Sequence, residues 1–172
     1  MDKTTILFWL LPLSIIMHNI EEFVFPGGFI DWYKRYKPEI KESINPRILT
    51  ITNILLVLGA LNPVLNGENI VGVVSWLAFA SIAGMNIFYH LKGTFLTREY
   101  SPGLITSIIL YLPLTFYGYY YFLSTKQVSW GVAGICSVVG ILTQLLLNFN
   151  HKRRTRILNM KQADRGEPAS QS

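Results

Sequence analysis

Hydrophobic residues gather in five segments of about twenty residues, separated by short polar stretches or by stretches that contain proline and glycine. Twenty helical residues span about 30 Å, which is the thickness of the hydrocarbon layer of a bilayer. The pattern therefore predicts an all-α fold, a polytopic bundle of five transmembrane helices in one domain of residues 1–150. The expected helices are residues 5–25, 45–65, 70–91, 101–123 and 128–148.

Two further stretches lie outside these segments. Residues 29–45 mix aromatic and basic side chains, which predicts a short interfacial stretch lying on the lipid headgroups. Residues 151–172 begin with a basic run and become polar. We expect them to form a cytoplasmic tail that is partly disordered.

The charge distribution predicts an orientation. The chain carries 15 Lys and Arg residues against 10 Asp and Glu residues, a net charge of +5. With five crossings, 13 of the 15 basic residues fall on one side, which predicts a cytoplasmic C-terminus and an outside N-terminus. Because the basic residues flank hydrophobic segments, the expected partner is the lipid bilayer of the cell membrane and not nucleic acid. A single cysteine, Cys136, excludes an internal disulfide.

The first hydrophobic segment contains the sequence His18-Asn19-Ile20-Glu21-Glu22. On a helix that turns about 100° per residue, Glu21 lies about 60° to one side of His18 and Glu22 about 40° to the other. All three side chains therefore share one face. Ionisable residues inside a membrane helix are costly, so this face is a candidate functional site.

Polar residues of the other segments reach the same depth. With the predicted topology, Asn86 and His90 lie at the cytoplasmic end of the third segment. The remaining three segments contribute polar residues to the same half, namely Thr50, Asn53, Ser101, Thr106, Ser107, Gln144 and Asn148. The sequence thus predicts a polar pocket between helices that opens toward the cytoplasm or the inner leaflet.

Two imidazoles and a carboxylate suit a divalent metal such as zinc or iron. His18, His90 and either Glu21 or Glu22 are the candidate ligands, and the sequence leaves open which glutamate binds. The other glutamate would act as general base on a metal-bound water. Asn86 and Ser101 would position the substrate. The first hypothesis is a metal-dependent membrane hydrolase that acts on a lipid-like or membrane-associated substrate.

Other interpretations stay open. In the second hypothesis the same residues perform metal-free acid–base chemistry, and the layout is similar to that of five-helix sterol isomerases of the EXPERA type. The third is a non-enzymatic carrier of an ion or small molecule, or a haem protein that uses His18 and His90 as ligands. A fourth gives the site no chemistry, with the glutamates paired to Lys34 or Arg35 at the headgroups.

Three short motifs carry a family resemblance. They are the His18–Glu22 sequence, the Asn-x-x-x-His sequence of residues 86–90, and Ser101-Pro102-Gly103. With these motifs in this order, the chain resembles the HXXEE family of small bacterial integral membrane proteins. The resemblance implies a membrane protein and implies no particular activity.

Overall fold

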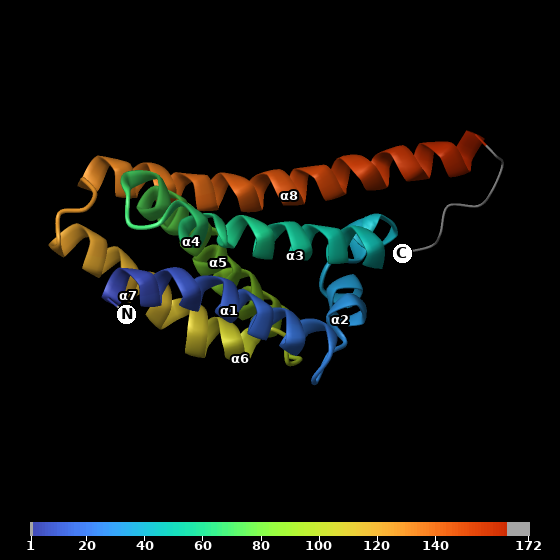
Figure 1. The fold of residues 1–172 in the computed structure, drawn as a ribbon. Coiled ribbons are helices and arrows are strands. Elements are labelled where there is room, and N and C mark those ends of the chain that lie inside the picture. The colour runs from blue at the N-terminus through green and yellow to red at the C-terminus, as the bar shows by residue number, and fades with distance from the viewer. Residues whose placement is uncertain (1, 165–172) are drawn as a thin grey trace.

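The computed structural model describes residues 2–164, apart from the side chains of Glu42 and of residues 161–164, and within that range it contains helices and no strand (Figure 1). The predicted all-α fold is therefore confirmed. The α-helices are α1 (Lys3–Phe23), α2 (Phe29–Tyr36), α3 (Pro46–Ala60), α4 (Asn62–Asn66), α5 (Ile70–Thr97), α6 (Leu104–Thr106), α7 (Leu112–Ser124) and α8 (Trp130–Asp164). A 3-10 helix, η1, covers Pro38–Ser43, and a π-helical turn, η2, covers Ser107–Tyr111.

Four helices of the described chain are long and apolar enough to cross a membrane: Lys3–Phe23, Pro46–Asn66, Ile70–Thr97 and Trp130–Met160. The fourth segment expected from the sequence is helical as well, but it consists of the three consecutive pieces α6, η2 and α7. Each piece alone is shorter than a bilayer is thick. Four candidate spans are thus shown, whereas the fifth crossing and the orientation remain predictions.

Local sequence explains where these helices begin. Asp2 accepts a hydrogen bond from the Thr5 amide at the start of α1, and Asn69 accepts one from the Gly72 amide at the start of α5. Asn45 precedes Pro46 in the same role at α3. Such side chains satisfy amides that have no partner within the first helical turn. Proline at the first position of α3 fits because its missing amide would be unpaired there.

Helix α5 lies at the centre of the bundle and packs along α8 on one side and against α1 and α7 on the other. In Figure 1, α8 runs along one side of the molecule, while α1, α6 and α7 lie on the opposite side. Helix α8 continues to Asp164, so residues 151–164 of the expected tail are helical. The rest of that tail, residues 165–172, lies outside the described residues.

Two apolar clusters form the interior. The first lies among α1, α5 and α7 and includes Leu11, Trp76 and Phe122. The second gathers buried residues of α2, η1 and the turn before α3: Phe29, Trp32, Tyr33, Ile40 and Ile44. The aromatic face of α2 thus packs onto α5, whereas the interfacial position predicted for residues 29–45 stays a prediction. A β-carbon added at Gly93 of α5 would lie 2.4 Å from the Trp32 ring, which shows how closely the ring approaches the α5 backbone.

Candidate metal centre

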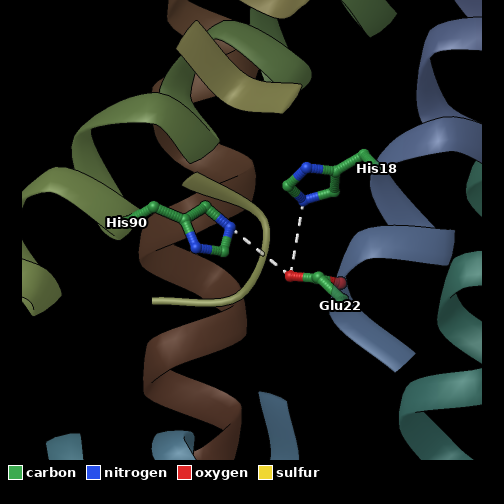
Figure 2. A group of neighbouring side chains, drawn as sticks. All are labelled: His18, Glu22 and His90. Carbon is green, nitrogen blue, oxygen red and sulfur yellow. Dashed lines mark ion pairs between the residues drawn. The ribbon is translucent and has the colours of Figure 1, made fainter. Parts of the chain in front are cut away.

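Three buried side chains meet between the two apolar clusters. His18 and Glu22 stand one turn apart on α1, and His90 faces them from α5 (Figure 2). Glu22 Oε1 lies 3.3 Å from His18 Nε2 and 3.4 Å from His90 Nε2. The exposed fractions of His18, Glu22 and His90 are 2%, 4% and 0%. One ligand atom from each residue lies within 4.8 Å of the other two, a spacing that can hold a metal ion.

A hydrogen-bond chain fixes the His18 ring. Its Nδ1 lies 2.9 Å from the Thr106 hydroxyl, and that hydroxyl donates to the Glu21 carboxylate. Because the single hydroxyl proton goes to Glu21, the oxygen of Thr106 accepts from an Nδ1–H of His18. The Nε2 atom of the ring then carries a lone pair directed at Glu22.

His90 is oriented in the same way by a hydroxyl from the turn that precedes α6. Its Nδ1 lies 2.8 Å from the hydroxyl of Ser101. Its Nε2 forms no hydrogen bond within the described part of the chain, although the ring is fully buried. Metal-binding histidines usually have one ring nitrogen held by a neighbouring oxygen while the other faces the ion. Both imidazoles of the site show this arrangement.

The Gly103 backbone lies against both imidazole rings. Its φ is +98°, a conformation that favours glycine. A β-carbon here would lie 2.6 Å from Cε1 of His90 and 2.7 Å from Cε1 of His18. The Ser101-Pro102-Gly103 motif therefore has two functions visible in the structure: it supplies the hydroxyl for His90 and lets the backbone approach both imidazoles.

Glu21 points to a different place. Its carboxylate accepts hydrogen bonds from the amides of Ile105 (3.0 Å) and Thr106 (2.7 Å), and from the hydroxyls of Thr106 and Tyr100. A negative charge at the first turn of the helix that starts with α6 is favourable. Burial, and the hydrogen bond to Glu21, raise the pKa of Tyr100. Glu21 thus connects α1 to α6 and to Tyr100 in the turn before it. Glu22 is the glutamate that faces the two imidazoles.

The structure also places the other predicted residues. Asn86 Nδ2 lies 3.1 Å from His18 Nε2, and Asn86 Oδ1 accepts a 3.5 Å hydrogen bond from Gln144. Asn86 is therefore beside the three ligand atoms, whereas Ser101 lies behind the His90 ring. The interpretation without site chemistry paired the glutamates with Lys34 or Arg35, but Arg35 pairs with Glu99 at 2.9 Å.

Aromatic rings surround the two histidines. Tyr111 lies 4.7 Å from the His18 ring centroid, and Trp32 lies nearly parallel to the His90 ring at 6.2 Å. The Phe29 centroid is 5.9 Å from that of His90. Neither Trp32 nor Phe29 is among the site residues that the sequence predicts, but Phe29, Trp32, Tyr33 and Tyr36 recur every three to four residues, a spacing that indicates a packed helix face.

The burial of Glu22 and the spacing of the three ligand atoms indicate whether the group can bind a metal ion. A buried carboxylate needs a cation or several hydrogen bonds to offset its lost hydration. In a tetrahedral zinc site with metal–ligand bonds of 2.0–2.2 Å, neighbouring ligand atoms lie about 3.4 Å apart, and in an octahedral site about 3.0 Å apart. The 3.3 Å and 3.4 Å separations from Glu22 to the two imidazoles are close to the tetrahedral value, and the two imidazole nitrogens lie within 4.8 Å of each other. The group could therefore hold a metal ion.

A cavity of about 560 Å³ adjoins the site. Glu22 and Asn86 lie in its wall, together with residues of α2, α3, α5 and α8. The polar residues Asn53, Gln144 and Asn148 line the same cavity, so side chains from several helices converge on one space. One of the three candidate ligands, Glu22, thus forms part of the cavity wall.

Comparisons with known proteins agree with these motifs. The family described as "Protein of unknown function with HXXEE motif" matches residues 9–118. The uncharacterized protein YrkK of Bacillus subtilis (strain 168) is 28% identical over 139 residues, covering 78% of this chain and 86% of that protein. No solved structure matches the chain. The matched region contains all three motifs, and the chain therefore belongs to the HXXEE family, as its sequence predicted.

Proposed function

We propose that this protein is an integral membrane protein that binds one divalent metal ion through His18, Glu22 and His90. We further propose that it uses the ion to hydrolyse a lipid-like substrate. One observation carries the metal proposal: two imidazoles, each held at Nδ1 by a hydroxyl, direct Nε2 at the same oxygen of a buried carboxylate. In metal sites, too, the second ring nitrogen of each histidine ligand is usually hydrogen-bonded to a neighbouring oxygen.

The surface of the bundle supports a membrane location. Ala60 is the only buried residue of α3, and the exposed side chains of this helix include Ile51, Ile54, Leu55 and Leu58. Helix α8 likewise exposes Leu142, Leu145 and Leu146. Soluble monomers rarely expose contiguous apolar surfaces of this extent, whereas lipid covers them without cost.

The ligand set supports the enzymatic part of the proposal. Two histidines and one carboxylate leave a fourth tetrahedral position for water, as in hydrolytic zinc sites. A bound metal would lower the pKa of that water to about 7 and so supply a nucleophile at neutral pH. Glu22 and Asn86 line the cavity, so a substrate held there would lie next to this position. Asn86, through its amide, would orient that substrate.

Elemental analysis of the detergent-purified protein tests the metal site. We expect about one equivalent of zinc or iron in the wild type, and a loss of most of it in His90→Ala and in Glu22→Gln. His151→Ala is the matched control, because His151 also bonds to a serine hydroxyl, that of Ser43 at 2.9 Å, yet lies outside the site. Absence of stoichiometric metal from the folded wild type, both as purified and after incubation with zinc or iron, would refute the proposal.

One contact favours metal-free acid–base chemistry as the second candidate. The Asn86 amide lies on His18 Nε2 at 3.1 Å, where it engages the lone pair that a metal would need. If a metal binds, Asn86 must turn away, so Asn86→Ala should keep or strengthen metal binding. Loss of metal in Asn86→Ala would instead make Asn86 part of the coordination.

The haem alternative is not favoured by the geometry. The His18 and His90 ring centroids are 5.0 Å apart in an edge-to-face arrangement, with Glu22 Oε1 near both Nε2 atoms. A macrocycle between two axial ligands would need that space. Purified protein without a Soret band is the expected result.

A further inference from the structure

The cavity beside Glu22 has a basic rim, formed by Lys37, Lys92 and Arg154. These residues come from three separate places in the chain: the turn after α2, helix α5 and the extension of α8. Among the described residues that line the cavity, Glu22 is the one acid, and it already faces two histidines. The rim therefore carries positive charge that the cavity wall does not neutralise.

Contacts of the rim residues agree with this. None of the three forms an ion pair with a described residue. Lys37 Nζ lies 3.4 Å from the Asn148 Oδ1 atom, a neutral partner. Burial lowers the pKa of Lys37, Glu39 raises it, and the nearby charges of Lys92 and Lys152 lower it further. An anion placed at the rim would relieve the repulsion among these cations.

The side walls of the cavity have a different character. Ile48 of α3, Phe88 of α5 and Leu145 of α8 line it, and all three are exposed apolar side chains. Helices α3 and α8 run alongside each other in Figure 1 without packing extensively on one another. The cavity thus combines cations at one end with an apolar flank that faces the surrounding lipid in a membrane.

We propose that this cavity binds one anionic lipid, with its phosphate or carboxylate headgroup on the basic rim and its acyl chain along the apolar flank between α3 and α8. Such a lipid is the substrate class of the neighbouring metal centre, and this part rests on the proposed function. A soluble anion would use the rim but would leave the apolar flank without a ligand. Both Glu22 and the basic rim line the cavity, and the attraction of the headgroup to the rim would also orient the molecule.

Native mass spectrometry of the detergent-purified protein tests the proposal. The probes are phosphatidylglycerol, phosphatidylcholine with the same acyl chains, and glycerol phosphate as the headgroup without chains. We expect one phosphatidylglycerol to bind at least about tenfold more tightly than either other probe. The choline cation of phosphatidylcholine offsets its phosphate charge, and glycerol phosphate has no acyl chain to cover the apolar flank.

A pair of triple variants separates this site from general attraction to a basic protein. The site variant is Lys37→Gln/Lys92→Gln/Arg154→Gln. The control variant is Lys34→Gln/Arg47→Gln/Arg153→Gln, which removes the same net charge from exposed residues that do not line the cavity. We expect the site variant to lose the preference for phosphatidylglycerol and the control to keep it.

Each other outcome overturns the proposal in a recognisable way. Equal loss in both triple variants means adsorption by net charge, and loss in neither means that the rim does not bind the lipid. Equal binding of glycerol phosphate and phosphatidylglycerol means a site for soluble anions. Metal content measured on the same samples keeps the proposals apart, because the rim substitutions leave the three candidate ligands in place.

Discussion

Replacing Gly103 by alanine probes the geometry of the site most directly. The added methyl group would lie 2.6 Å from His90 Cε1 and 2.7 Å from His18 Cε1, well inside van der Waals contact. A non-glycine residue at positive φ costs about 1–2 kcal/mol. Overpacking of a buried site adds about 1–3 kcal/mol. The variant should therefore lose about 2–5 kcal/mol of unfolding free energy, and both imidazoles should move.

Gly28→Ala is the matched control for this variant. Gly28 has a φ of +84°, close to the +98° of Gly103, but a β-carbon there would meet nothing within 4 Å. The control carries the backbone cost without the steric one. The difference between the two variants, about 2 kcal/mol from overpacking, corresponds to a difference in melting temperature of roughly 4–8 °C for a chain of this size.

The single cysteine makes the measurement simple. Cys136 is 2% exposed, so a thiol-reactive fluorescent dye reports its exposure as the protein unfolds in detergent. Metal content is measured on the same samples. We expect Gly103→Ala to melt lower than Gly28→Ala and to retain less metal. Equal melting temperatures and equal metal content in the two variants would show that Gly103 does not contact the two imidazoles.

Three further predictions concern the support of the site. Ser101→Ala removes the hydroxyl that is hydrogen-bonded to His90 Nδ1 and should weaken metal binding about 10- to 100-fold. Titration with a competing chelator measures the metal affinity. An unchanged affinity would show that the hydroxyl does not orient the ring. Tyr100→Phe removes one of several donors to Glu21, so it should cost only about 0.5–1.5 kcal/mol in the dye assay and leave metal content intact. A loss of metal in this variant would tie Glu21 to the ion. Chelation of the wild type should lower its melting temperature, because metal present at 100 times its Kd stabilises the fold by about 2.7 kcal/mol; an unchanged melting curve after metal removal would contradict this.

Several features followed from the sequence alone. The helical segments and the turns between them follow from apolar runs of about twenty residues and from capping residues and prolines such as Asn45 and Pro46, which act within one or two turns of the chain. The candidate ligands His18 and His90 also followed, because ionisable side chains are exceptional in such runs. These inferences need only local spacing and the cost of burying charge.

The tertiary structure decided which of two adjacent glutamates faces the histidines. Neighbours on a helix point about 100° apart, so Glu21 and Glu22 share a broad face but meet different partners once other segments pack against α1. Glu22 meets His90 of α5, while Glu21 meets the amides that begin α6. Three other features depend on segments far apart in the chain. They are the hydrogen bond between Thr106 and His18, the contact of Gly103 with both imidazoles, and the basic rim of the cavity. No local pattern specifies such contacts, because they arise only when the helices pack.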